Sequence, residues 1–90
     1  RACALGQASA ANLGAGILGA TPDELRAAHA ALAAYLRQEE PLPETVTARF
    51  PELMLFEPAR PHLARHGSIL LAFDTAAEAA EAARAARQAA

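Results

Sequence analysis

The sequence predicts the start of a helix at Thr21-Pro22-Asp23-Glu24. The Thr21 hydroxyl can accept a hydrogen bond from a free N–H of the first turn, and Glu24 can complete a capping box. Pro22 suits the first helical position, and Asp23 lies near the positive end of the helix dipole. Apolar residues then recur at helical spacing, which predicts a helix over 22–38 that stops before Pro41.

A second helix is predicted over 2–18, ahead of this start. It has one stripe of larger residues, Leu5, Ser9, Leu13 and Ile17, and one stripe of small residues, Gly6, Ala10 and Gly14. Interior glycines weaken a helix, so the small stripe predicts a neighbouring backbone at close range. Gly19 is suited to end the helix in the left-handed conformation.

A third helix is predicted over 68–88, with a buried stripe of Ile69, Leu70, Phe73, Ala77 and Ala80. Glu81 and Arg84 are spaced to pair along this helix. Asp74-Thr75 has the character of a second helix start, so a helix broken at that point is the alternative to one continuous helix.

Between the second and third helical segments, residues 41–65 hold five of the six prolines. This composition predicts a connector with short turns at most. Its apolar residues are expected to anchor it on the helices: Phe50, Leu53, Met54, Leu55 and Phe56. The chain is therefore expected to be mostly α, with three helices and a proline-rich connector in one domain over 1–90.

The composition also excludes several classes of protein. Charged residues are 20%, the formal net charge is −2 and all eight basic residues are arginine, which argues against a nucleic-acid binder. The uncharged run from Ala2 up to Asp23 is too rich in Gly, Ser, Gln and Asn to span a membrane. A single cysteine excludes an internal disulfide and suits a reducing cytoplasm.

Cys3 and His66 are the candidate metal ligands. Cys3 enters a predicted helix, where free N–H groups favour the thiolate that binds metal or attacks sulfur; a small buried hydrophobe is the alternative. His66 precedes the last helix, where it is either a metal ligand or a solvated loop residue. His62 is a weaker candidate, and His29 belongs to an apolar helical stripe. No acid–base pair or phosphate-binding loop indicates an enzyme.

In order along the chain, four segments resemble the IscU/SufU/NifU N-terminal family of iron–sulfur cluster scaffold proteins. The segments are Arg1-Ala2-Cys3-Ala4-Leu5-Gly6-Gln7-Ala8-Ser9-Ala10, Gly19-Ala20-Thr21-Pro22-Asp23-Glu24-Leu25, Phe56-Glu57-Pro58-Ala59-Arg60 with Ala64-Arg65-His66, and Ser68-Ile69-Leu70-Leu71-Ala72-Phe73. The first is similar to the family's second ligand cysteine with its Ser/Ala-rich helix, and the third to its "PVR…H-C" segment. Gly67 stands where the family has its third ligand cysteine.

The resemblance implies the helical half of an α+β domain, with the family's sheet and first ligand cysteine in an N-terminal half outside this chain. It implies iron–sulfur cluster assembly, in which the protein accepts sulfur from a cysteine desulfurase and passes a cluster to apo iron–sulfur proteins. Cys3 and His66 would ligate iron, the cluster or zinc, and Arg65 would ease the negative charge of the site. The alternative is a degenerate homologue that builds no cluster and acts as an interaction module of the assembly machinery.

Overall fold

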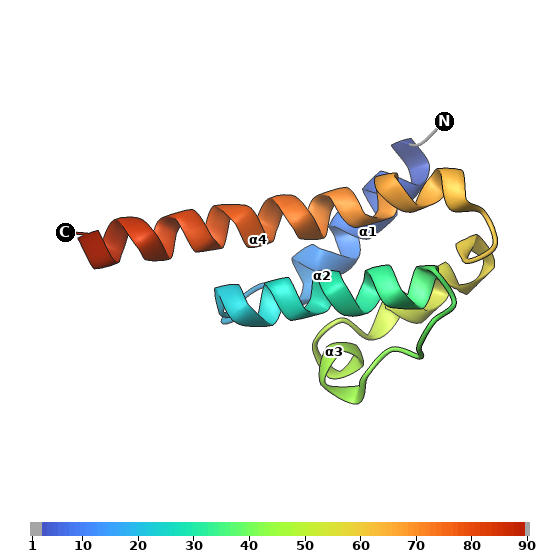
Figure 1. Cartoon of the computed structure of the whole chain (residues 1–90), viewed down its shortest axis with the longest axis horizontal. Helices are drawn as coiled ribbons and strands as arrows, with labels where there is room; N and C mark the ends of the chain where they lie inside the picture. The colour runs from blue at the N-terminus through green and yellow to red at the C-terminus, as the bar shows by residue number, and fades with distance from the viewer. Residues whose placement is uncertain (1–2, 90) are drawn as a thin grey trace.

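The computed structural model describes residues 3–89, with the backbone alone at Cys3. The elements in order are α1 Cys3–Gly16, α2 Pro22–Leu36, α3 Glu44–Arg49, the 3-10 helices η1 Pro51–Ala59 and η2 Leu63–Arg65, and α4 His66–Ala89 (Figure 1). No strand occurs within residues 3–89, so the prediction of a mostly helical chain is confirmed.

The capping box at the start of α2 is confirmed. The Thr21 hydroxyl accepts a hydrogen bond of 3.1 Å from the Glu24 backbone N–H, and the Thr21 N–H donates one of 2.9 Å to Glu24 Oε1. Gly19 adopts φ +80° between α1 and α2, which is the left-handed conformation predicted for the end of the first helix.

The α4 helix is continuous from His66 to Ala89, which confirms one last helix and excludes the alternative of a break at Asp74-Thr75. The Asp74 carboxylate does not cap a new helix. It lies 2.9 Å from Arg26 Nη1 on α2, so its partner is the neighbouring helix. The helix also begins two residues before the predicted start at Ser68, and it therefore includes His66.

The connector is more ordered than its prolines predict, because α3, η1 and η2 occupy much of 44–65. Val46 anchors α3 in the core, and Phe50, Leu53 and Phe56 anchor η1, as expected for those three aromatic and aliphatic residues. The same expectation is wrong for Met54 and Leu55, which are exposed. A 3-10 turn presents every third residue to one face, so residues 53 and 56 are buried while 54 and 55 point outward.

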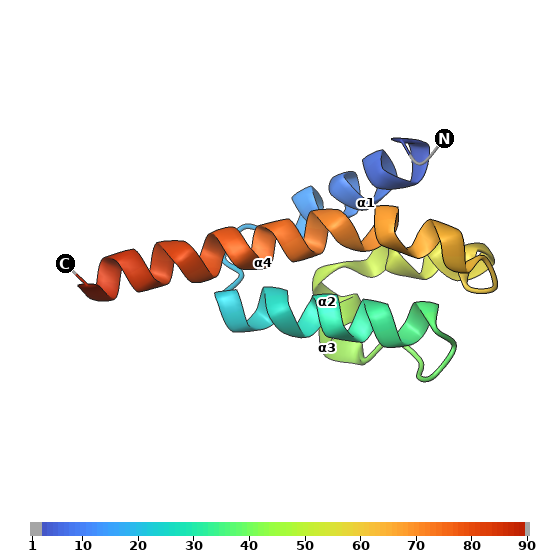
Figure 2. The ribbon, with the colours of Figure 1, turned by 45° about the horizontal axis from the view of Figure 1, so that its top comes forward.

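The central helix is α4, with α1 on one side of it and α2 with α3 on the other (Figure 2). The α2 helix runs antiparallel to α4, whereas α1 starts at the end of the molecule where α4 starts (Figure 1). The core lies mainly between α2, α4 and η1. Its fully buried large side chains are Leu25, Leu32, Leu36, Phe50, Leu53, Ile69 and Phe73.

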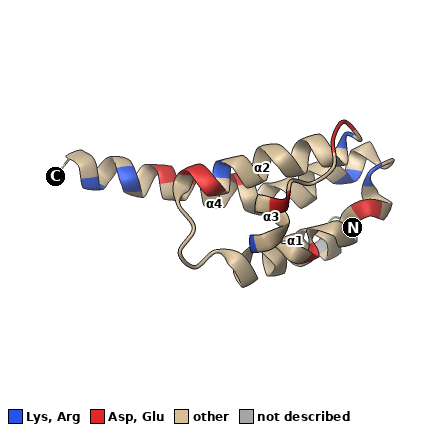
Figure 3. Cartoon of the chain, turned by 90° about the horizontal axis from the view of Figure 1, so that it is seen from below, with Lys and Arg blue, Asp and Glu red and all other residues tan. Residues whose placement is uncertain are grey.

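Charged side chains join α2 to α4 along the edge of this core, and Figure 3 colours the charged positions along the ribbon. Arg26 donates to Asp74 and to both oxygens of Glu81, and Arg84 lies 3.3 Å from Asp23. The pairing of Glu81 with Arg84 predicted along the last helix is therefore replaced by two contacts to α2. Antiparallel packing makes this possible, because it sets the start of α2 beside the second half of α4.

Candidate functional site

The first turns of α1 and α4 lie side by side. The Ser9 hydroxyl of α1 donates a hydrogen bond to the Ile69 carbonyl of α4. A Cβ built on Gly6 would lie 3.7 Å from the Ser68 carbonyl oxygen, which is ordinary van der Waals contact. The helix starts that carry Cys3 and His66 therefore occupy the same end of the molecule (Figure 2). The side chain of Cys3 is outside the described residues, so its distance from the His66 ring stays a prediction.

His66 is buried, with 6% of its surface exposed, and it is the first residue of α4. The predicted loop position is therefore corrected. Its Nε2 lies 3.0 Å from the Ala59 carbonyl oxygen and 3.1 Å from the Arg60 carbonyl oxygen. Both partners can only accept, so Nε2 must carry a proton. In the neutral ring the lone pair then belongs to Nδ1, and no described residue donates to that atom.

The two carbonyls that receive this bond end η1, and the Arg60 side chain holds that end against α2. Arg60 Nε donates a 2.8 Å hydrogen bond to the Tyr35 carbonyl oxygen. Its guanidinium carbon lies 4.3 Å from the centre of the Tyr35 ring, in cation–π range. Tyr35 is itself buried, and that burial raises the pKa of its phenol. His66 is thus connected to α2 through Arg60.

Other residues near this end add little to a ligand set. Gly67 is exposed, and a Cβ there would meet nothing within 4 Å. His62 is exposed in the connector, and His29 is half-buried on α2. Among residues whose side chains are described, no group of three His, Cys, Asp or Glu side chains could hold a metal ion. His66 is the member of the predicted pair whose environment the structure describes.

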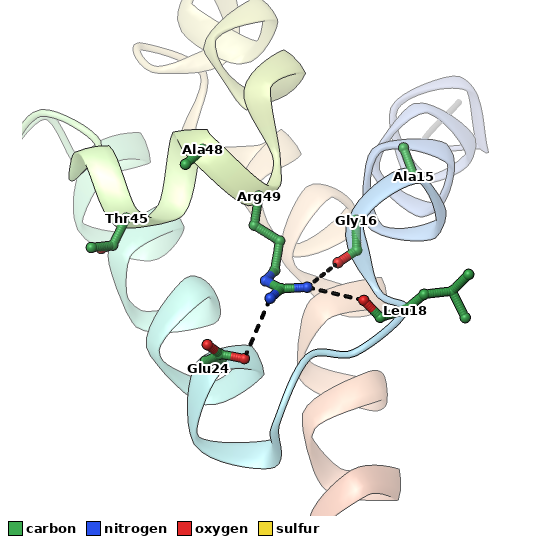
Figure 4. Close-up of a pocket in the computed structure, with 7 residues that line it drawn as sticks. All are labelled: Ala15, Gly16, Leu18, Glu24, Thr45, Ala48 and Arg49. Carbon is green, nitrogen blue, oxygen red and sulfur yellow. Dashed lines mark hydrogen bonds and ion pairs between the residues drawn. The ribbon is translucent and has the colours of Figure 1, made fainter.

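A separate hollow of about 520 Å³, which sequence reasoning missed, lies between α1, α2 and α3 (Figure 4). Arg49 Nη1 donates to the Gly16 and Leu18 carbonyl oxygens at 3.1 Å each, and Nη2 lies 3.7 Å from Glu24 Oε1. The guanidinium therefore satisfies carbonyls at the end of α1, so its role is structural. The signal that could have indicated this contact is Gly16, the last glycine of the helix.

An apolar groove of about 640 Å³ runs between α1 and α4. It is lined chiefly by small side chains, and Leu71 on its wall is 63% exposed. The predicted small-residue stripe contributes Gly6 and Ala10 to this groove. A Cβ built on Gly14 would meet nothing within 4 Å. Among the described glycines, the closest backbone approach is at Gly16, which lies outside that stripe.

Comparison of this chain with protein-family models, with curated proteins and with solved structures finds no match. Across the described helices, no segment combines the length and apolar character needed to cross a membrane.

Proposed function

We propose that this chain is the helical half of an iron–sulfur cluster assembly scaffold, for which iron and the cluster are cargo. One observation carries the proposal. His66 lies at the end of the molecule where α1 and α4 begin, and two backbone carbonyls accept from its Nε2. In metal-binding histidines, the N–H of one ring nitrogen characteristically donates a hydrogen bond to a carbonyl or carboxylate oxygen. This bond orients the other ring nitrogen toward the metal.

The roles follow from this arrangement. Nδ1 of His66 is the ligand atom, because Nε2 carries the proton. Cys3 supplies a thiolate, favoured by the positive end of the α1 dipole, and receives sulfur from a cysteine desulfurase. Thiolate and imidazole together suit iron and zinc alike, and Arg65 lies next to His66 in the sequence to ease the negative charge. The cluster would pass to apo iron–sulfur proteins of the cytoplasm.

The same proposal assigns the helices to an α+β domain. The groove between α1 and α4 is apolar and walled by small side chains, with Leu71 largely exposed. Such a face suits packing against a sheet, which is how the scaffold family uses its helices. The proposed sheet belongs to the family's N-terminal half, together with its first ligand cysteine.

Anaerobic titration of the purified protein with Fe²⁺ and with Zn²⁺ tests the metal site. Cys3→Ser and His66→Gln should each weaken binding, by about 10-fold or more for loss of a ligand or its orientation. Gln retains an N–H that can donate to the Ala59 and Arg60 carbonyls but lacks Nδ1, so it separates ligation from folding. His62→Gln is the matched control and should bind like the parent. Unchanged affinity in both Cys3→Ser and His66→Gln would refute the proposal.

Gly67 favours the second candidate function, an interaction module that builds no cluster. Glycine supplies no ligand at the position where the family has its third cysteine. A Cβ built on Gly67 would meet no other atom within 4 Å. A protein that binds a cysteine desulfurase but takes up neither metal nor sulfur would support this second function. Uptake of sulfur on Cys3, measured by mass spectrometry after reaction with desulfurase and cysteine, would support the first.

A further inference from the structure

We propose that Arg60 is a positioning residue for His66. Its side chain fixes the end of η1 against α2, so that the Ala59 and Arg60 carbonyls hold the imidazole with the proton on Nε2. Nδ1 is thereby kept as the nitrogen with the lone pair. The tautomer needs no metal, and only its consequence for binding rests on the function proposed above.

Two backbone carbonyls fix the tautomer of His66. Two carbonyl oxygens, at 3.0 and 3.1 Å, share the one proton of His66 Nε2. If the proton moved from Nε2 to Nδ1, Nε2 would present a lone pair to the two carbonyl oxygens. This would replace a hydrogen bond by repulsion within a buried site, where an unmade hydrogen bond is costly. The tautomer is therefore fixed only as long as the two carbonyls stay in place.

The turn that carries these two carbonyls is joined to α2 by the Arg60 side chain. The segment between η1 and α4 is short, its one element is the three-residue helix η2, and its residues 61–65 are exposed. Within η1 and the turn after it, the Arg60 N–H donates to Glu57 O at 3.0 Å and the His62 N–H donates to Ala59 O at 2.9 Å. These bonds are local and would move together with the turn. Buried Phe56 and Ala59 hold η1 in the core, and the polar contacts from this turn to α2 come from the Arg60 side chain.

The Arg60 side chain is held on α2 by two contacts with Tyr35. Arg60 makes two different interactions with one residue, a 2.8 Å bond to the Tyr35 carbonyl and a 4.3 Å cation–π contact with its ring. The carbonyl belongs to the last turn of α2, where it also accepts a 3.0 Å hydrogen bond from the Gln38 N–H. Arg60 therefore joins the backbone end of α2 to the backbone turn that accepts from His66, and its planar guanidinium suits both contacts at once.

The test is ¹⁵N NMR of the metal-free protein labelled at histidine, at a pH about two units above the ordinary histidine value of about 6.5. The wild type should show His66 as a single Nε2–H tautomer. In Arg60→Gln, the Nδ1 and Nε2 shifts should move toward each other as both tautomers become populated. Tyr35→Phe keeps the ring and the carbonyl and should preserve the wild-type shifts. Arg87→Ala, which removes a charge at the far end of α4, should also preserve them.

Circular dichroism establishes that each variant is folded. If Arg60→Gln does not fold, Arg60→Lys takes its place, because lysine keeps the charge but cannot stack and donate as a planar fork. A folded Arg60 variant that retains a pure Nε2–H tautomer would overturn the inference, and so would a wild type with mixed tautomers. A purely structural role for Arg60 would lower the unfolding midpoint without changing the tautomer.

Co²⁺ binding, followed by its visible absorption, separates this inference from the proposed metal function. Arg60→Gln should bind Co²⁺ about 10-fold to 100-fold more weakly than the wild type, the usual effect of losing the group that orients a ligand. If the wild type binds no Co²⁺ while the tautomer still responds to Arg60, the function fails and the positioning role stands. If the wild type and Arg60→Gln bind equally with identical tautomers, the positioning role fails and the function stands.

Discussion

The α4 helix is held on its two sides by different kinds of contact. Against α2 it places large apolar side chains and charges: Phe73 is fully buried, and Arg26 reaches across to Asp74 and Glu81. Phe73 also meets Phe50 edge to face, with ring centres 5.2 Å apart. This side gains its stability from the volume of buried hydrocarbon, which is the larger source of folding free energy.

Contacts of α1 with the rest of the molecule include the buried Leu13, but several of the close ones involve small residues and backbone atoms. The Ser9 hydroxyl bonds to the Ile69 carbonyl, and Gly16 packs against the Arg49 carbonyl and the Phe50 ring. Mutations on the two sides should therefore lower the stability of the fold for opposite reasons. Removing atoms should damage the α2 side most, while adding atoms should damage the α1 side most.

The largest expected difference in stability is between two truncations, one leucine on the α2 side and one on the α1 side. Leu32 of α2 has no exposed surface, so Leu32→Ala should lower the free energy of unfolding by about 2–5 kcal/mol. Leu5 of α1 is only partly buried at the edge of the core, and Leu5→Ala should cost about 1 kcal/mol. Urea unfolding measures both. Equal losses would show that α1 contributes as much buried volume as α2.

The next effect in size is the addition of one methyl group within α1. A Cβ at residue 16 would lie 2.8 Å from two Phe50 ring carbons and closer still to the Arg49 carbonyl oxygen. Gly16→Ala should therefore cost about 1–3 kcal/mol. Gly14→Ala is the matched control, since nothing lies within 4 Å, and it should stabilise the helix by up to about 1 kcal/mol. Changes of the same sign would contradict the close approach at Gly16.

A smaller effect separates the start of α2 from its packing. Thr21→Ala removes the hydroxyl that caps α2 and should cost about 1 kcal/mol of unfolding free energy. Thr21→Ser keeps the hydroxyl and should cost much less. Thermal unfolding of the two variants compares them. A Thr21→Ala protein with the wild-type midpoint would show that packing against α4 alone determines where this helix begins.

The smallest effect concerns the ion pairs between α2 and α4. The Arg26 hydrogen bond holds the pKa of Glu81 below its usual range. A lowered folded pKa means that the pair stabilises the fold above the unfolded carboxyl value of about 4.3, and that this stabilisation is lost as pH falls through the folded pKa. Because Glu81 is exposed to solvent, the loss should be small and should shrink further in high salt.

Arg26→Met should therefore lower the urea midpoint slightly at neutral pH and leave it unchanged in acid. Glu78→Gln, on the same helix and exposed, is the control, since Glu78 forms no ion pair with a described residue. An equal shift for Arg26→Met at both pH values would indicate that the arginine acts through the packing of its aliphatic part.

Features set by neighbouring residues could be predicted from the sequence. The capping box, the turn at Gly19 and the helical spacing of 22–38 depend on local geometry, and the structure has all three within two residues of the predicted bounds. The short helix α3 was missed because six residues carry too little periodicity, and Val46 alone anchors it in the core.

Features that depend on which helices meet could not be predicted in this way. Glu81 has a suitable partner three residues along its own helix, yet it pairs with Arg26, and only the antiparallel packing of α2 brings that residue near. His66 is similar: Gly67 and the nearby prolines suggested a loop, while its burial results from η1 folding back onto the start of α4. Its partners Ala59 and Arg60 offer backbone carbonyls, which leave no signal in the identity of the side chains.

The continuity of α4 has a mechanical consequence for His66. Asp74, whose carboxylate pairs with Arg26, lies eight residues beyond His66 on the same helix, about 12 Å at 1.5 Å per residue. A tilt of about 5° around that contact would move the first turn of α4 by about 1 Å, roughly half the length of a metal–nitrogen bond. A change in the partly exposed ion pairs of Arg26 is therefore expected to alter the placement of an imidazole that they do not contact.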